Sequence, residues 1–182
     1  MVRALKFHER KLLKKVDFYN YKSDPSLREN AVLRTYHIQR REDYIKYNLL
    51  AGQVRKIANR LSMLDPKDPF RDKTTDALLD KLYRMGLITA AKSLSQCEKM
   101  TVSAFCRRRL PVVMVRLKMA ETVKQAVIYV EQGHIRVGPQ TVTDPAYLVS
   151  RNMEDFITWV DSSKIKHKIM KYNDKLDDFD LL

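Results

Sequence analysis

Hydrophobic residues recur at helical spacing between Glu42 and Leu64. The apolar positions advance by alternating steps of four and three, at Leu50, Val54, Ile57, Leu61 and Leu64. Such steps place side chains on one face of a helix, so the pattern predicts a long helix with a continuous buried stripe. Asp65-Pro66 follows the last of these positions and is expected to end the helix, because proline disfavours helical backbone in the residue before it.

A second helix is predicted from Thr75 to Met85, preceded by a turn at Asp68-Pro69. Its expected buried positions are Leu78, Leu79 and Leu82. Gly86 follows directly, and glycine is the residue that most readily takes the left-handed conformation in which many helices end. We interpret both helices mainly as scaffold, since apolar stripes of this kind usually pack in a core.

The predicted helices become shorter after Thr101. Ser103 is a candidate cap for a short helix that would include Phe105 and three arginines. Two further helices are predicted, Pro111 to Met119 and Thr122 to Gln132, because proline suits the first position of a helix and valines recur at helical spacing in the second. Gly133 is expected to end the last helix in a left-handed conformation.

Alternating polar and apolar residues follow, as in strands. The segments are His134 to Val137, Thr141 to Thr143, Tyr147 to Val149 and Phe156 to Val160, separated by Gly138-Pro139 and Asp144-Pro145. Helices followed by a short antiparallel sheet predict an α+β fold, in which a helical N-terminal region packs on a small second domain. We expect an N-terminal arm (1–34), a helical region (35–100), the second domain (101–165) and a C-terminal tail with an acidic end (166–182).

Positive charge dominates the chain and is unevenly distributed. The 182 residues carry a net charge of +13. Residues 1–64 contribute +9 and residues 101–136 contribute +5, while the remaining residues together contribute −1. A field of this kind attracts polyanions, so nucleic acid is favoured as a partner over the alternative of a merely basic soluble protein. The N-terminal arm holds a basic cluster that we expect to order on RNA or protein: Arg3, Lys6, Arg10, Lys11, Lys14 and Lys15.

The candidate RNA-binding residues lie in the second domain. They are Arg107, Arg108, Arg109, Arg116, Lys118, Lys124, His134 and Arg136. Successive residues of a helix point in different directions, so at least two of the three consecutive arginines should face solvent or a ligand. Guanidinium groups suit phosphate oxygens, and we expect the whole set to converge into one groove for polyphosphate.

Few features favour catalysis, a cofactor or a membrane. The four glycines are scattered, so no glycine-rich phosphate loop is present, and Cys97 and Cys106 with His134 match no common zinc spacing. Apolar runs such as Leu110 to Val115 are far shorter than the ~20 residues of a membrane helix. We expect a non-catalytic protein without metal or cofactor, in a reducing compartment such as the nucleus or cytosol.

Three runs carry a resemblance to a known family. They are Cys106 to Pro111, Arg116 to Ala120 and Gln132 to Val137, and they resemble the S4-type RNA-binding domain. Upstream, Asn48 to Leu64, Asp68 to Phe70 and Leu78 to Leu87 resemble the helical region of the eukaryotic ribosomal protein that contains this domain. One departure is that Val123 and Val127 stand where that domain often has arginines, and Glu121 stands where a Ser or Thr cap is usual.

More narrowly, the chain resembles a protein family of the U3 small nucleolar ribonucleoprotein. The stretches that carry this resemblance are Lys11 to Phe18, Gly133 to Gly138, Met153 to Asp155, Thr158 to Asp161 and Asp177 to Asp180. It implies a nucleolar factor of the small-subunit processome that binds U3 small nucleolar RNA and precursor small-subunit rRNA and promotes their pairing. It also implies a scaffold phosphoprotein and other processome proteins as partners. The alternatives are a structural protein of the mature small ribosomal subunit and a protein-interaction scaffold.

Overall fold

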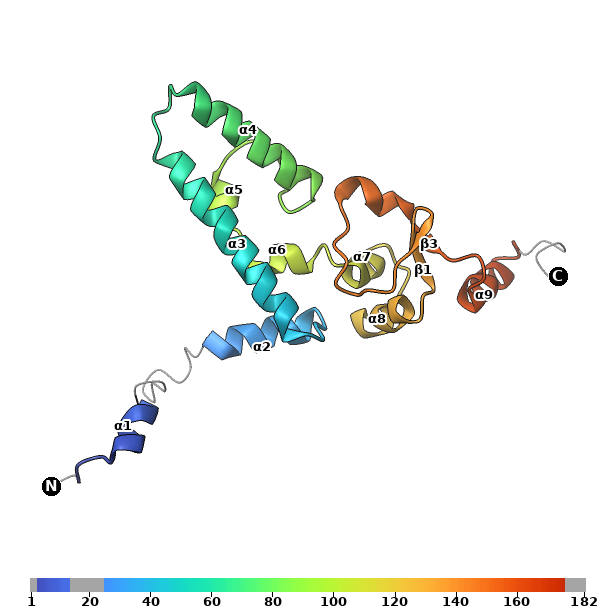
Figure 1. The fold of residues 1–182 in the computed structure, drawn as a ribbon. Helices are drawn as coiled ribbons and strands as arrows, with labels where there is room; N and C mark the ends of the chain where they lie inside the picture. Colours follow the sequence, from blue (N-terminus) through green and yellow to red (C-terminus); the bar gives the residue numbers. More distant parts are fainter. Residues whose placement is uncertain (1–2, 14–24, 176–182) are drawn as a thin grey trace.

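The computed structural model describes residues 3–13 and 25–175 (Figure 1). Within these residues the chain is mostly helical, with one small antiparallel sheet near its C-terminal end, which confirms the predicted α+β class. The first helix, α1 (Phe7–Leu13), lies within residues 1–34, the predicted N-terminal arm. No helix among the described residues is long and apolar enough to cross a membrane.

Helices α2 to α6 form the first unit. Their bounds are α2 (Pro25–Thr35), α3 (Arg41–Ser62), α4 (Pro69–Arg84), α5 (Ser95–Glu98) and α6 (Val102–Cys106). Helix α4 begins six residues before the predicted Thr75, because the Asp68 carboxylate accepts the Phe70 N–H and Pro69 occupies the first turn. At its other end Gly86 has a φ of 72°, which confirms the predicted left-handed helix end.

The buried face of α3 differs from the predicted stripe. Leu50, Ile57 and Leu64 are exposed. The residues that enter the core are Tyr47, Ala51, Ala58 and Leu61, with Val54 half-buried beside them. The true face therefore lies to one side of the line of large aliphatic residues, and two of its four buried residues are alanines. Small residues allow α5 and α6, which contact α3, to approach it closely. The spacing of large aliphatic residues did not reveal this face of the helix.

Helices α7 (Leu110–Arg116) and α8 (Val123–Glu131) and the sheet form the second unit. The two helices pack together over a core that includes Val113, Met114, Val130 and Ile135. Thr122 caps α8 by accepting the Gln125 N–H, so the cap is the residue after Glu121, the position where the resemblance placed it. Val127, one of the two valines that depart from the family pattern, is buried in packing with the protein.

Three strands make up the sheet, in the order β2-β1-β3. Strand β1 (Ile135–Val137) pairs antiparallel with β2 (Gln140–Thr141) and with β3 (Ile157–Trp159), so the predicted hairpin and closing strand are confirmed. Between β2 and β3 the chain contains a short 3-10 helix, η2 (Arg151–Phe156). The strand predicted at Tyr147 to Val149 is reduced to one bridge between Leu148 and Arg109.

The two units meet along α3 and α6. Phe105 of α6 stacks on Tyr47 of α3, with ring centroids 6.1 Å apart, so α6 belongs to the core of the first unit. The Tyr47 hydroxyl donates to the Ala146 carbonyl of the second unit across 3.2 Å. Burial raises the pKa of Tyr47 to about 12. Packing therefore changes from one core to the other between Cys106 and Leu110, and the domain division expected at residue 101 stays a prediction.

Candidate nucleic-acid interface

The three consecutive arginines follow α6 and do not continue it. Helix α6 ends at Cys106, and Arg109 already has extended backbone, with φ of −64° and ψ of 140°. The three side chains consequently leave the backbone in different environments. Arg107 is exposed and has no ion pair within the described residues, whereas Arg108 and Arg109 are 5% and 1% exposed.

Arg108 is fixed between the two units. Its Nε donates to the Val149 carbonyl at 2.9 Å, and its Nη1 lies 3.1 Å from a Glu154 carboxylate oxygen. The other oxygen of Glu154 accepts from Arg116. A side chain at Gly86 would place its Cβ 2.8 Å from the Arg108 Cζ, so the guanidinium group occupies space that only glycine leaves open. These contacts make Arg108 part of the junction between the units.

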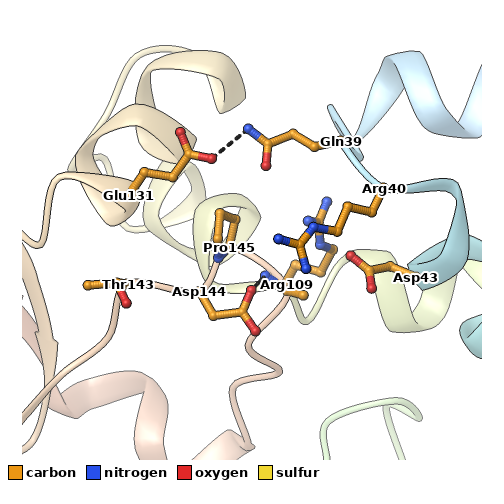
Figure 2. Close-up of a pocket in the computed structure, with 9 residues that line it drawn as sticks. Gln39, Arg40, Asp43, Arg109, Glu131, Thr143, Asp144 and Pro145 are labelled. Atoms are coloured by element: carbon orange, nitrogen blue, oxygen red, sulfur yellow. Dashed lines mark hydrogen bonds between the residues drawn. The ribbon is translucent and has the colours of Figure 1, made fainter.

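Arg109 lies in a separate cavity of about 440 Å³. Its Nη1 donates to the Tyr36 carbonyl at 3.4 Å. The cavity is also lined by Arg40, three carboxylates and neighbouring residues; the carboxylates belong to Asp43, Glu131 and Asp144. Figure 2 shows this cavity, with the Gln39 amide donating to the Glu131 carboxylate across 2.7 Å. Because carboxylates and arginines both line this cavity, it is poorly suited to polyphosphate.

The expected single groove is therefore wrong. Arg107, Arg108 and Arg116 line one cavity and Arg109 lines another, and these two cavities share no lining residue. In addition, Glu154 neutralises part of the charge of Arg108 and Arg116. The reason is the extended backbone at Arg109, which turns that side chain toward α2 and α3, while sequence reasoning assumed a helix through all three arginines.

Three other predicted cations are exposed around the connection between α7 and α8. The Arg116 side chain is 51% exposed, and Lys118 and Lys124 are also exposed. Lys118 has a φ of 59°, a left-handed conformation that few non-glycine residues adopt, and it ends α7 sharply before the next helix. Lys124 lies in the first turn of α8. With Arg107, these residues are the cations of the predicted set that remain available to a ligand.

His134 and Arg136 are held inside the second unit by polar contacts. The His134 Nδ1 lies 3.1 Å from the Ser163 hydroxyl. Arg136 donates from Nε to the Thr158 hydroxyl at 3.0 Å and from Nη1 to Asp161 at 2.6 Å. The hydrogen bond from Lys166 and the charge of Arg136 lower the pKa of Asp161 below its ordinary value. Both predicted residues thus support the sheet, with Arg136 partly exposed.

The predicted N-terminal contacts are only partly described. Arg3 pairs with Glu9 at 2.6 Å, and Arg10 donates to the Leu5 carbonyl at 3.1 Å. Lys6 and Lys11 are exposed, while Lys14 and Lys15 lie outside the described residues.

Sequence reasoning missed one basic helix, α9 (Lys164–Tyr172). Lys164, Lys168 and Lys171 are exposed, follow one another at helical spacing, and share one face of it. No residue of α9 is buried, and Figure 1 shows the helix projecting beyond the sheet. The buried Ser163 hydroxyl caps it by accepting the Ile165 N–H. Lysine spacing of this kind was the signal that could have found the helix.

Arg151 of η2 was also missed. Its guanidinium carbon lies 4.1 Å from the centre of the Tyr83 ring, and its Nη2 donates to the Ile88 carbonyl at 3.0 Å. Within residues 3–13 and 25–175 no group of three or more His, Cys, Asp or Glu side chains could hold a metal ion.

Comparisons with known proteins match the whole chain. Residues 4–107 match the family described as "Ribosomal protein S4/S9 N-terminal domain", and residues 108–155 match the "S4 domain". The Saccharomyces cerevisiae "U3 small nucleolar ribonucleoprotein protein IMP3" is 61% identical over 181 residues, covering 99% of each chain. Its Homo sapiens counterpart is 58% identical over all 182 residues and 99% of that chain. "Small ribosomal subunit protein uS4" of Methanothermobacter thermautotrophicus is 29% identical over 164 residues, 89% of this chain and 95% of the other.

The two family matches agree with the two units of the fold. Together they place the chain in the class of proteins that contain an S4 domain. Within that class, the chain belongs to the IMP3 family of U3 small nucleolar ribonucleoprotein proteins. The resemblance seen in the sequence is thereby confirmed.

Proposed function

We propose that the chain is a non-catalytic, RNA-binding ribosome-biogenesis factor of the nucleolus. In this role it binds U3 small nucleolar RNA and precursor small-subunit rRNA within the small-subunit processome and promotes their pairing. The observation that carries the proposal is similarity along the full length to proteins named for the U3 small nucleolar ribonucleoprotein. The excess of positive charge in residues 101–136, part of it exposed, supports it further.

The proposed mechanism is electrostatic. Two RNAs that must pair repel each other through their phosphates, and a protein that neutralises phosphates releases counterions and lowers this repulsion. Arg107, Arg116, Lys118 and Lys124 would make the main contacts, since they are exposed. Contacts to the backbone and to RNA shape would hold one strand open for the other.

Further contacts are proposed outside this surface. The basic residues of the arm (1–34) would bind RNA or protein, and the lysines of α9 would add phosphate contacts. The helical region (35–100) would serve mainly as scaffold for the RNA-binding domain (101–165). The scaffold phosphoprotein of the U3 particle and other processome proteins are the proposed protein partners.

A charge-reversal experiment tests RNA binding. The variant Arg107→Glu, Lys118→Glu, Lys124→Glu should bind U3 RNA more weakly, and the slope of log affinity against log salt should fall by about two to three. A matched triple variant on α3, at the exposed Lys46, Lys56 and Arg60, should change binding less. Equal losses in both variants would contradict this surface. Annealing of complementary U3 and precursor rRNA fragments, followed by fluorescence, tests whether the protein accelerates pairing.

A structural protein of the mature small subunit is the second candidate, because the similarity extends to uS4 proteins at 28–29% identity. Sedimentation separates the two. A processing factor should travel with precursor particles and be absent from translating ribosomes, whereas a structural protein should be found in both.

A further inference from the structure

Two neighbouring cavities lie at the end of the first unit, and one of them reaches the second unit. The first has a volume of about 310 Å³ and is lined by four arginines, Arg107, Arg108, Arg116 and Arg151, together with Glu154. The second has a volume of about 370 Å³, and Met100 and Lys99 contribute to its lining. Leu87, Ile88, Thr89 and Ala104 line both cavities. The two cavities are therefore neighbours, and together we call them the junction groove.

The arginine end of the junction groove has more positive than negative charge. Glu154 pairs with Arg108 and Arg116, while Arg107 and Arg151 have no carboxylate partner in the described part of the chain. The buried Arg108 Nη2 and Arg151 Nε also lack a hydrogen-bond partner there. Uncompensated charge near a buried arginine favours an anion, and the exposed Arg107 and Arg116 are placed to donate to it.

The other end of the junction groove is more apolar. Leu87, Met100 and Ala104 supply the apolar wall. Ser95 and Gln96 lie at the same end and can donate and accept hydrogen bonds. An apolar wall beside a few polar groups is the environment that a flat aromatic base requires, because the ring faces need apolar contact and the edges need hydrogen bonds.

We propose that the junction groove binds one unpaired nucleotide of RNA, with its base at the apolar end and a phosphate at the arginine end. Cavities of this size admit a small ligand and exclude a double helix. Arg107 lies at the end proposed for the phosphate, and the apolar wall lies at the end proposed for the base. A phosphorylated peptide side chain would need only the arginine end. This inference rests on the proposed RNA-binding function.

The test uses the full chain and two labelled RNA hairpins that differ by a single bulged uridine. We expect the bulged hairpin to bind about tenfold more tightly than the fully paired one, the effect of one additional charge-assisted contact. If the chain binds both hairpins equally, the junction groove is not a nucleotide site although RNA binding stands. If it binds neither, the proposed function itself fails.

Two variants assign the preference to the groove. Thr89→Trp fills it from an exposed position shared by both cavities and should abolish the preference with little change in affinity for the paired hairpin. Arg107→Gln should reduce the preference, whereas Arg60→Gln, which changes another exposed arginine on α3, should leave it unchanged. Persistence of the full preference in both groove variants would overturn the proposal.

Crosslinking provides a readout that does not depend on variants. A photoreactive uridine at the bulge should crosslink to peptides within residues 86–107. Crosslinks confined to residues 118–137, which line neither cavity, would overturn the proposal. Displacement of the bulged RNA by a phosphorylated peptide, without any preference for the bulge, would also overturn it and assign the groove to a phosphoprotein.

Discussion

The first unit and the junction between the two units use arginine in different ways. In the first unit, no arginine within residues 25–106 is buried, although several lie along α3. At the junction, Arg108 and Arg109 are almost fully buried. They lie where the chain passes from one core to the other, so their surroundings are set by the junction. The contrast teaches that a run of arginines next to a change of core can be structural even in a basic protein.

The largest expected effect comes from removing the buried member of this run. Arg108→Ala deletes the contacts to Val149 and Glu154 and should lower the free energy of unfolding by about 3 kcal/mol, a typical cost of breaking a buried ion pair. Arg107→Ala, one residue earlier and exposed, should change it by less than about 0.5 kcal/mol. Urea denaturation measures both. Similar losses of unfolding free energy in the two variants would contradict the distinction between the buried and the exposed arginine.

A smaller effect is expected at Gly86. Gly86→Ala introduces a Cβ 2.8 Å from the Arg108 Cζ at a backbone φ of 72°, which should cost about 2 kcal/mol of unfolding free energy. Gly52→Ala is the matched control, because Gly52 lies within α3 and a Cβ there meets nothing within 4 Å. That variant should be stabilised by about 0.5–1 kcal/mol. Thermal and urea denaturation should show that Gly86→Ala destabilises the protein and that Gly52→Ala stabilises it.

The hydroxyl of Tyr47 tests the link between the units. Tyr47→Phe removes one hydrogen bond to Ala146 and should lower the free energy of unfolding by about 1 kcal/mol. Tyr44→Phe, on the same helix, should have almost no effect. Because burial raises the pKa of Tyr47 to about 12, its contribution is complete below the unfolded pKa near 10 and is lost as the pH rises through 12. An alkaline titration should therefore show that the difference in unfolding free energy between the unchanged protein and Tyr47→Phe decreases as the pH rises above 10.

The smallest expected effect concerns the two cysteine thiols in the core of the first unit. Cys97 and Cys106 are buried, and burial raises both thiol pKa values, that of Cys106 to about 11. Alkylating reagents should therefore label neither thiol in the folded protein at neutral pH and both in denaturant. Mass spectrometry measures the label. If Arg108→Ala increases labelling of Cys106, the junction also supports the neighbouring core.

Much of the fold could be predicted because it depends on local signals. Gly86 and Gly133 both have positive φ values, as their positions after apolar helices predicted. The hairpin around Gly138 and the closing strand at Ile157 follow from alternation of polar and apolar residues. In each of these cases the sequence signal and the structural element lie within a few residues of each other.

The candidate site was less predictable because it depends on contacts that are distant in the sequence. Arg108 meets Glu154 and Gly86, and Arg109 meets Tyr36. No local pattern indicates these partners. The face of α3 was misplaced for a related reason, since alanines that fill a close helix contact give a weaker signal than exposed leucines.

The Ser163 cap has a consequence for the helix that it begins. Because its buried hydroxyl also contacts His134, the start of α9 is tied to the sheet. A cationic segment anchored in this way is preorganised: binding would restrict its lysine side chains, while the backbone is already ordered. Each lysine on α9 should therefore contribute more to affinity than the same residue on an unstructured chain.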